Sequence, residues 1–411
     1  MKAEIVSVGT ELLLGEITDT NASYLAQQLA PLGIDLYWIS AVGDNLGRLS
    51  EAVRRALGRS DLLLMTGGLG PTEDDLTREA IAAVLGEEMV VIPELERDLR
   101  EFFARRGVKM PERNLKQATL IRSASALPNP IGTAPGWWVE KDGRIIAAMP
   151  GVPVEMRRMW EQEVAPRLRA RFGGMVIFAR TLKIIGLGES TVADMISELL
   201  DSSNPTLATY AKADGIHVRI AAKAASEAEA RALIARPEAR VREILGDTVY
   251  GVDDDTLEGA IGRLLRERNL CVATFEGCTA GMLAATLTNV PGSSAYFKGG
   301  AVAYAAGTKE AWGVDPALLA AHGAIGLEAS RAMATAARSR LEADIGVGVT
   351  GVAGPEAVGD IPAGTFFVAV DYRGRLLAEA TNWRTTRSEV RRREVMFALA
   401  LLRRALLGEK S

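Results

Sequence analysis

The sequence is poor in the residues that build disulfide frameworks and metal centres. Its 411 residues include two cysteines, Cys271 and Cys278, and two histidines, His217 and His322. Small secreted scaffolds need more cysteine, so a reducing cytoplasm is the expected compartment. So few histidines exclude a multi-histidine metal centre. Any metal is therefore expected to bind oxygen ligands, as magnesium does.

Long apolar runs and an excess of one charge are also missing. No run of eighteen apolar residues occurs, so we expect no membrane span and no targeting segment. The formal net charge is −4, and acidic and basic residues are interleaved along the chain. We therefore expect no basic surface for direct nucleic-acid binding. The densest basic run, Arg391 to Arg393, is interpreted as the solvated face of a helix.

The length exceeds what one hydrophobic core usually organises, so the sequence predicts several domains. Alternating strand and helix patterns over residues 1–172 predict an α/β domain with a parallel, doubly wound sheet. A shorter pattern over 173–252 predicts a small α+β linker domain. A third pattern over 253–411 predicts a C-terminal α/β domain.

Within the first domain, residues 3–9 predict a strand, and Asn21 is placed to cap a helix over about 22–31. Asn45 is placed to cap the next helix. Because crossovers between parallel strands are right-handed, the loops after successive strands should lie along one edge of the sheet. These loops are 10–15, 43–45 and 66–75.

The most informative segment connects a strand to a helix and contains Gly67, Gly68 and Gly70. Glycine lets the backbone pass close to a diphosphate, and exposed amides at a helix start attract anionic oxygens. Asp74 and Asp75 follow and can hold a divalent cation. The alternative is that both acids only stabilise the first helical turn. The combination of glycines and acids favours a site for phosphate and metal.

The C-terminal part offers a serine and a lysine close together in sequence, Ser294 and Lys309. We place Lys309 at the start of a helix that follows the strand AVAYA. A partly desolvated lysine can deprotonate a serine hydroxyl without histidine. Gly-Ser-Ser is also an ordinary turn, and a lone lysine is usually solvated, so the residues alone leave both interpretations open.

Specific sequence blocks resemble the CinA family. Over about residues 1–170, the blocks VGTELLLGEITDTNASYL, VGDN, TGGLGPTEDDLT and MPGVPVEM resemble its N-terminal domain, which has a molybdopterin-binding-like fold. Over about 256–408, the blocks GSSAYFKGGAVAYAAGTKEAWGV, AHGAI, VGVTGVAGP and TTRSEVRRR resemble its nicotinamide-nucleotide amidase domain.

For the N-terminal domain, the resemblance implies hydrolysis of ADP-ribose to AMP and ribose 5-phosphate with Mg²⁺ or a similar divalent metal. The backbone amides from Gly67 to Gly70 would hold the charge that develops on the leaving phosphate. Asn21 is either a substrate contact or only a helix cap, and Met149 to Gly151 is either part of the site or a simple turn. The candidate residues for metal binding or water orientation, with Asp75 also catalytic, are Glu11, Asp44, Asp74 and Asp75.

For the C-terminal domain, the resemblance implies conversion of nicotinamide mononucleotide and water to nicotinate mononucleotide and ammonia, without a cofactor. Ser294 matches the nucleophile and Lys309 the base, with Tyr304 nearby. The matching substrate contacts are Thr279, Thr350, Gly351 and Arg387.

The chain departs from the amidase pattern at several positions. Gly277 stands where the family usually has serine in Glu-Ser-Cys-Thr-Gly-Gly. Glu356-Ala357 replaces the usual glycines, and Thr385-Thr386-Arg387 replaces Gly-Asp-Arg. Loss of one active-site hydrogen bond often lowers a rate about a hundredfold, so a reduced or lost deamidase stays open beside the predicted active one. In that alternative the loop at Ser294 only packs the domain.

Two other functional classes stay open beside this two-enzyme interpretation. One is a molybdopterin-handling enzyme, which is less favoured because Gly9-Thr10-Glu11 stands where those enzymes commonly have Gly-Asp-Glu. The other is a competence or recombination accessory protein that binds a recombinase. The resemblance also implies a homodimer with the two nucleotides as its small-molecule partners.

Overall fold

The computed structural model describes residues 1–172 and 174–408, which form two compact units. One unit holds Met1–Ala179, Ser203–Thr206 and Ala221–Arg236, and the other holds Arg180–Ser202, Leu207–Ile220 and the chain from Pro237 onward. The predicted boundary at residue 173 and the last three residues of the predicted third domain lie outside the described residues. Among the described helices, none has the length and apolar character needed to cross a membrane.

The first unit contains a mixed six-stranded sheet with the order β2-β1-β3-β8-β7-β6. The pairs β2–β1, β1–β3 and β3–β8 are parallel, as predicted, whereas β8–β7 and β7–β6 are antiparallel. The antiparallel step arises at Asp142-Gly143, where positive φ angles of 49° and 77° close a tight hairpin. The strands are β1 Lys2–Val8, β2 Asp35–Val42, β3 Leu62–Thr66, β6 Ala124–Leu127, β7 Gly136–Lys141 and β8 Arg144–Met149.

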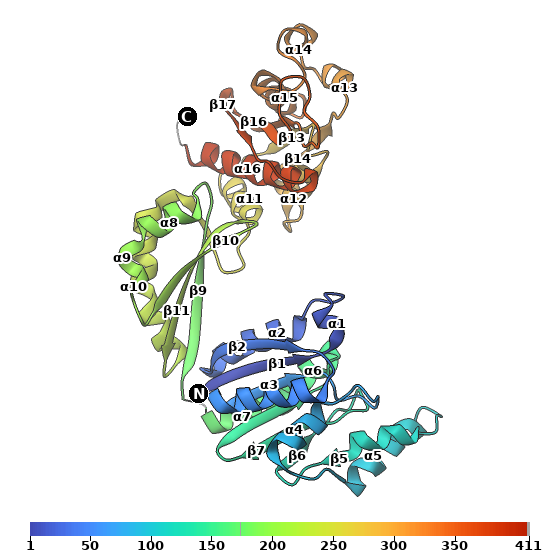
Figure 1. The fold of residues 1–411 in the computed structure, drawn as a ribbon. Helices are drawn as coiled ribbons and strands as arrows, with labels where there is room; N and C mark the ends of the chain where they lie inside the picture. Colours follow the sequence, from blue (N-terminus) through green and yellow to red (C-terminus); the bar gives the residue numbers. More distant parts are fainter. Residues whose placement is uncertain (173, 409–411) are drawn as a thin grey trace. The chain divides into compact units, whose positions relative to one another are not determined.

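Helices cover both faces of this sheet, as the doubly wound prediction requires (Figure 1). Side chains alternate along β3: Leu62 and Leu64 pack with α2, α6 and α7, while Leu63 and Met65 pack with α3 and α4. These helices are α2 Thr20–Leu29, α3 Leu46–Arg59, α4 Thr77–Leu85, α6 Pro153–Met159 and α7 Ala165–Phe172. The shorter or peripheral elements are α1 Thr10–Leu13, η1 Ala30–Leu32, β4 Val90–Val91, α5 Pro93–Ala104, η2 Glu112–Ala118, β5 Thr119–Leu120 and the π-helical turn η3 Trp160–Val164.

The middle of the chain forms a small four-stranded sheet with the order β10-β11-β9-β12, in which β12 runs antiparallel to β9. The predicted small α+β domain is therefore confirmed, with two strands, β10 and β12, that the sequence analysis did not predict. Its elements are β9 Val176–Ile184, α8 Glu189–Met195, α9 Ser197–Leu200, β10 Thr206–Lys212, β11 Gly215–Ala224, α10 Glu227–Leu245, η4 Gly246–Thr248 and β12 Val249–Val252.

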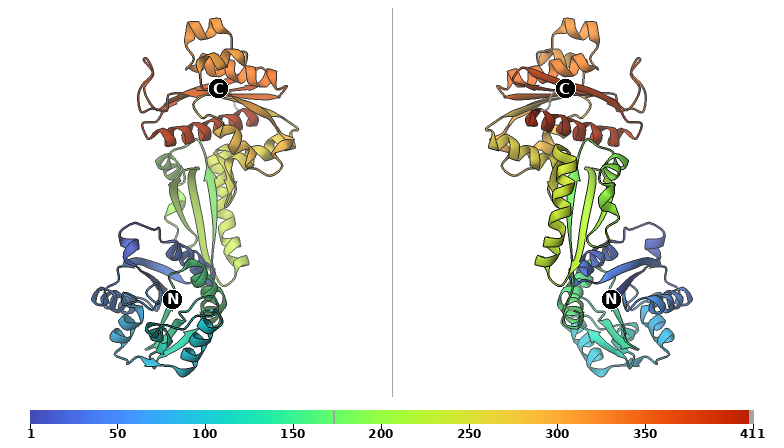
Figure 2. Two further views of the ribbon diagram at one scale, coloured as in Figure 1. Left: turned by 90° about the vertical axis from the view of Figure 1, so that its right-hand side faces the viewer. Right: turned by 90° about the vertical axis from the view of Figure 1, so that its left-hand side faces the viewer.

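The C-terminal sheet has the order β14-β13-β15-β16-β17, with β14, β13 and β15 parallel and β16 and β17 antiparallel to their neighbours. One face packs against α11, α12 and α16, and the other against α14 and α15 (Figure 2). The elements are α11 Leu257–Glu267, β13 Val272–Glu276, α12 Met282–Thr288, η5 Ser293–Ala295, β14 Phe297–Val302, α13 Ala306–Ala311, α14 Pro316–His322, α15 Leu327–Arg340, β15 Ile345–Gly351, β16 Thr365–Tyr372, β17 Arg375–Asn382 and α16 Arg387–Leu407.

The central strand β15 uses glycine to bring α15 close to the sheet. Its residues Ile345, Val347 and Val349 pack with the α16 side, and Gly346 and Gly348 alternate with them. A Cβ atom at Gly346 would lie 1.9 Å from the Ala334 carbonyl oxygen, and one at Gly348 would lie 2.2 Å from that of Ser330. The absence of side chains at Gly346 and Gly348 therefore sets the distance between sheet and helix.

We expect Gly346→Ala to lower the melting temperature of the C-terminal domain, because the added methyl group collides with helix backbone that cannot move alone. Overpacking of this kind costs about 1 to 3 kcal/mol or more. Gly307→Ala is the matched control, since no heavy atom lies within 4 Å of its added Cβ and helix α13 favours alanine. Circular-dichroism melting compares the two variants, and equal melting temperatures would contradict the packing argument.

Candidate functional site

A pocket of about 420 Å³ lies at the carboxyl edge of the first sheet. The loops after β1, β2, β3 and β8 meet there, as predicted for loops that follow parallel strands. The structure thus brings together most of the residues that the sequence analysis selected for this domain. Those lining the pocket are Glu11, Asp44, Gly67, Gly68, Gly70, Asp74 and Asp75.

The glycine loop, residues 67–70, has every carbonyl group engaged on its inner side. The Gly67 carbonyl accepts from Thr77 Oγ1 at 2.8 Å and the Gly68 carbonyl from the Thr77 amide at 3.1 Å. The Leu69 and Gly70 carbonyls both accept from Arg78. Within the described chain, no acceptor faces the amides of Gly68, Leu69 and Gly70. The loop is therefore fixed with its donors left for an anion in the pocket.

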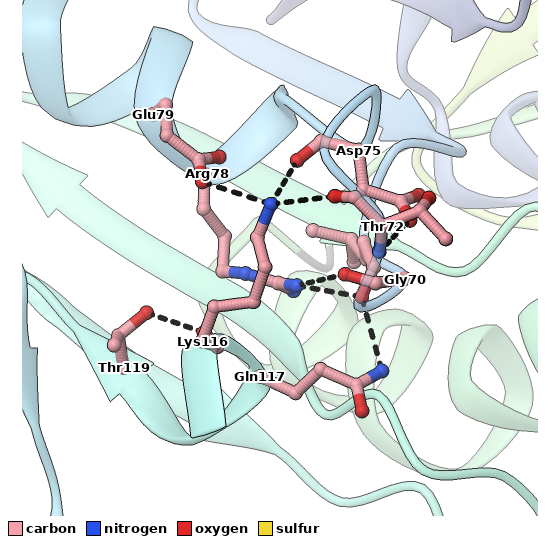
Figure 3. Close-up of polar contacts among 9 residues, drawn as sticks. Gly70, Thr72, Asp75, Arg78, Glu79, Lys116, Gln117 and Thr119 are labelled. Atoms are coloured by element: carbon pink, nitrogen blue, oxygen red, sulfur yellow. Dashed lines mark hydrogen bonds and ion pairs between the residues drawn. The ribbon is translucent and has the colours of Figure 1, made fainter. Parts of the chain in front are cut away.

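Two cations hold this loop from behind (Figure 3). The Arg78 guanidinium donates to the Leu69 and Gly70 carbonyls at 2.7 and 2.8 Å. Lys116 Nζ donates to the Thr72 and Asp75 carbonyls at 2.9 and 2.8 Å and pairs with Glu79 at 3.1 Å. Burial lowers the pKa of Arg78 to about 10, so it stays charged at neutral pH.

Three residues behind the pocket were not predicted from the sequence: Arg78, Lys116 and the buried Gln117, whose Nε2 donates to Thr133 Oγ1 at 3.2 Å. For Arg78 a signal existed. It lies three and four residues before Ile81 and Ala82 on the buried face of α4, where a charge is unexpected unless it has a partner. For Lys116 and Gln117 no local pattern indicates that a distant loop needs them.

At two positions of the loop, neighbouring atoms lie so close to the backbone that only glycine fits. Gly67 has a φ of +97°, and a Cβ there would lie 2.2 Å from the Val8 carbonyl oxygen of β1. A Cβ at Gly70 would lie 2.3 Å from Asp75 Oδ2. Any side chain at either position would displace the loop from the strand or from the acid that supports it.

The four predicted acids have different environments. Asp44 Oδ2 accepts from the Thr10 amide and hydroxyl, both at 2.8 Å, and Asp75 Oδ2 accepts from the Thr72 amide at 2.9 Å. These two carboxylates therefore shape the loops as well as line the pocket. Hydrogen bonding by Thr72 lowers the pKa of the exposed Asp74 carboxyl. Among described residues, the Glu11 carboxylate has no hydrogen-bond partner.

The donor set fits a hard divalent cation, because carboxylate oxygens are its preferred ligands. In the described chain, however, no three acidic, histidine or cysteine side chains converge on one point. The described residues of the pocket therefore do not form a complete set of protein ligands for a metal ion. Magnesium is commonly held by one or two carboxylates together with substrate phosphates and water, and the residues present fit that arrangement.

The prediction for Asn21 needs correction. The helix cap is Asp19, whose carboxylate accepts from the Ala22 amide at 2.9 Å. Asn21 is buried inside α2 and donates from Nδ2 to the Gly151 carbonyl at 2.8 Å. It does not line the pocket, whereas Gly151 does. Asn21 thus anchors the loop after β8 instead of capping its own helix.

In the C-terminal domain, the parallel strands β14, β13 and β15 bring Tyr304, Gly277 and Thr350 to one edge of the sheet. Lys309 joins them. It lies in the last turn of α13, not at its start, is only 3% exposed and points Nζ at the Ala303 carbonyl, 3.5 Å away. Burial lowers the pKa of Lys309. A buried lysine of this kind is suited to accept a proton.

Ser294 is not part of this cluster, and its predicted pairing with Lys309 is corrected. Ser294 lies in η5, before β14, while Tyr304 and Lys309 follow the end of β14. A six-residue strand separates the two positions, which corresponds to about 20 Å at 3.3 Å per residue. Ser294 is exposed at the opposite edge of the sheet.

The residue that does lie beside this cluster is Gly277. Its amide donates to the Val349 carbonyl at 2.8 Å, and the preceding Glu276 carbonyl accepts from the Ala303 amide. A Cβ at Gly277 would lie 3.3 Å from the Val349 carbonyl oxygen and 3.5 Å from Thr350 Oγ1. A small side chain would therefore fit tightly at this position, with a shift of a few tenths of an ångström at the Val349 carbonyl, and the chain supplies none.

Some of the other predicted substrate contacts are engaged in hydrogen bonding or packing within the domain. Thr279 is fully buried, and its hydroxyl donates to Glu276 at 2.7 Å. Glu276 also accepts three backbone amides at the start of α12. Gly351 packs against Phe366, because a Cβ there would lie 2.7 Å from that side chain. Thr350 and Arg387 are thus the predicted contacts that stay closest to the lysine edge.

Two arginines on α16 hold the surrounding loops. Arg387 donates to the Gly354 carbonyl at 2.8 Å and to the Tyr304 hydroxyl. Arg391 donates to the Cys278 and Thr279 carbonyls at 3.0 and 2.9 Å. The prediction of a solvated face is therefore wrong for Arg391. Arg391 is spaced three, four and seven residues from buried positions of α16, and this spacing indicates that it lies on the buried side of the helix.

A doubly wound domain with a glycine loop at its pocket, followed by a small α+β domain and a second α/β domain, defines a multidomain α/β protein. Three family models match: "Probable molybdopterin binding domain" at residues 4–170, "Damage-inducible protein CinA KH domain" at 179–251 and "CinA C-terminal domain" at 254–406. The chain belongs to the CinA family of competence and damage-inducible proteins.

Two relatives are similar to this chain over nearly its full length. A competence-damage inducible protein by name, from Symbiobacterium thermophilum, is 47% identical over 99% of both chains. A CinA-like protein from Thermosynechococcus vestitus is 44% identical over 99% of both chains. The solved structure of the protein CinA from Thermoplasma acidophilum is 31% identical and covers 40% of this chain and 98% of its own, with a TM-score of 0.38.

A buried acid behind the C-terminal cluster gives a pH-dependent prediction. Glu394 of α16 is fully buried, and its carboxyl lies beside the buried Cys278 thiol and has no backbone, charged or hydroxyl hydrogen-bond partner among the described residues. Burial raises the pKa of Glu394 to about 8, and the nearby Glu276 side chain adds to the rise. The folded state therefore keeps a proton that the unfolded chain releases near pH 4.5.

The free energy of unfolding should fall as the pH rises from about 4.5 to about 8 and then level off, by an amount on the order of a few kcal/mol. Glu394→Gln should remove most of this dependence, because glutamine stays neutral. The control is Glu267→Gln, an exposed position on α11. Melting curves between pH 5 and 9 test this, and an unchanged slope in Glu394→Gln would contradict it.

Proposed function

We propose that the N-terminal domain hydrolyses the diphosphate of ADP-ribose to give AMP and ribose 5-phosphate with the help of a divalent cation. One observation carries this proposal. The four carbonyls of the glycine loop are all bonded inward, which leaves the amides of Gly68, Leu69 and Gly70 facing a pocket lined with carboxylates. Anion donors beside hard cation ligands suit a phosphate ester bound together with magnesium.

Each residue has a defined task in this proposal. The loop amides donate hydrogen bonds to the diphosphate oxygens and stabilise the charge that grows on the leaving phosphate, at no cost of reorganisation because Arg78 and Thr77 already fix the loop. A divalent cation would neutralise the diphosphate and lower the pKa of a bound water. Glu11 is the acid without another partner in the described chain, so it is best placed to bind the cation or orient the attacking water.

We expect Glu11→Gln to lower kcat for ADP-ribose about a hundredfold and to raise the Mg²⁺ concentration needed for half-maximal rate. Glutamine keeps the shape of the side chain but is a weaker ligand. Glu16→Gln, in the same segment but outside the pocket and exposed, serves as the control. AMP release is measured by chromatography, and full activity of Glu11→Gln, or of the wild type in EDTA, would refute the role.

We propose further that the C-terminal domain binds nicotinamide mononucleotide but lacks the group that would attack its carboxamide. Lys309, Thr350 and Arg387 supply a buried base, a hydroxyl and a cation at the carboxyl edge of the sheet. Gly277 leaves the adjacent position without a hydroxyl, and Ser294 is too distant to replace it. In this proposal the domain is a nucleotide-binding module whose hydrolytic activity is low or absent.

Gly277→Ser should create or strongly increase ammonia release from nicotinamide mononucleotide. The backbone at residue 277 accepts a Cβ, and the new hydroxyl would lie near Thr350 and on the lysine edge, where Lys309 can take its proton. Ser294→Ala should change nothing in either background. A wild-type protein that already deamidates the nucleotide efficiently, or one that loses this activity in Ser294→Ala, would contradict the assignment.

A further inference from the structure

A second cavity of about 340 Å³ adjoins the pocket of the N-terminal domain. Gln117 and Thr133 line both hollows, so the two cavities share part of a wall. Asn129 of the second cavity is also bonded at 2.7 Å to Glu155 of the first. A ligand held on the glycine loop would therefore lie in a pocket that adjoins a second cavity, which no step of the proposed hydrolysis uses.

The shared wall is rigid. Gln117 is 1% exposed, accepts from Asn114 Nδ2 at 2.9 Å and donates to Thr133 Oγ1 at 3.2 Å. It also approaches the Leu69 carbonyl of the glycine loop at 3.4 Å (Figure 3). With these contacts, the loop that faces the phosphate and the wall of the second cavity keep a fixed relative position. The two hollows can then act as adjoining parts of one binding site.

The second cavity, which we call the α5 slot, has a character opposite to that of the pocket. Its lining is mainly apolar, with α5 side chains on one side and proline-rich chain on the other. The residues that define it are Leu95, Leu99, Phe102, Pro128, Pro130 and Pro135. Rigid apolar walls with an aromatic ring suit a planar ring system better than a sugar or a phosphate.

The ring of Phe102 is held in place from two directions. The Arg106 guanidinium lies 3.9 Å from its centroid, and the Phe103 ring packs edge-on with centroids 6.1 Å apart. A ring that is already fixed loses little freedom when a ligand contacts it, which favours binding. Phe102 is therefore the side chain of the slot with the largest expected contribution.

We infer that the α5 slot binds the planar nucleobase of a nucleotide whose phosphate lies on the glycine loop. The site would thus prefer nucleoside phosphates over sugar phosphates that lack a base. This inference rests on the proposed function for the phosphate pocket and adds a second subsite to it. It also gives α5 and the segment 128–135 a role in substrate selection.

The test compares two ligands that differ by the base, AMP and ribose 5-phosphate, by isothermal titration calorimetry with Mg²⁺ on the full chain. We expect AMP to bind the wild type at least tenfold more tightly than ribose 5-phosphate, since stacking on one aromatic ring is typically worth that much. Phe102→Ala should remove most of this preference without changing the affinity for ribose 5-phosphate. Glu101→Ala, a truncation one residue away on α5 at an exposed position outside the slot, should keep it.

A second variant guards against misfolding as the explanation. Ala126 lines the slot, so Ala126→Phe should fill it and weaken AMP binding while leaving ribose 5-phosphate binding intact. Equal affinity of the wild type for both ligands, an unchanged preference in Phe102→Ala and Ala126→Phe, or an equal loss for both ligands would overturn the inference.

Binding and hydrolysis are scored separately. If AMP selectivity depends on Phe102 but ADP-ribose is not hydrolysed, the proposed reaction fails and the base subsite stands. If ADP-ribose is hydrolysed and Phe102→Ala leaves KM unchanged, the subsite fails and the reaction stands.

Discussion

The N-terminal site depends on the way in which the carbonyls of residues 67–70 are held. Helix α4 supplies Thr77 and Arg78, which together take all four carbonyls, and this fixes the peptide planes with their amides toward the pocket. A buried guanidinium is costly unless it is hydrogen-bonded, and two of its nitrogens have no partner in the described chain. The buried Arg78 guanidinium therefore lowers local stability, and what it provides in return is a fixed orientation of the glycine loop.

Both α/β domains use the same geometric rule. The carboxyl ends of neighbouring parallel strands meet at one edge, so residues from distant parts of the sequence become neighbours there. In the first domain this places the acids after β1, β2 and β3 around the glycine loop. In the last domain it places Gly277, Tyr304, Lys309 and Thr350 together and leaves Ser294 at the other edge.

Charged side chains behind the sites act mainly on backbone. Arg78 and Lys116 bond loop carbonyls in the first domain, and Arg387 and Arg391 do so in the last. A cation bonded to carbonyls orients the opposite, amide side of the same peptides toward the ligand space. The two domains thus prepare their loops before any ligand arrives, which lowers the entropy lost on binding.

The sequence by itself determined the fold class, the sandwich of helices around strands such as β3, and the helix cap at Asn45, because these follow from local periodicity and short-range hydrogen bonds. It also located the glycine loop, because only glycine tolerates the close contacts at Gly67. It could not assign Arg78 to the loop, Asn21 to Gly151 or Lys309 to the Ala303 carbonyl at the edge opposite Ser294. Those contacts depend on strand order and direction, which arise only when the whole sheet assembles.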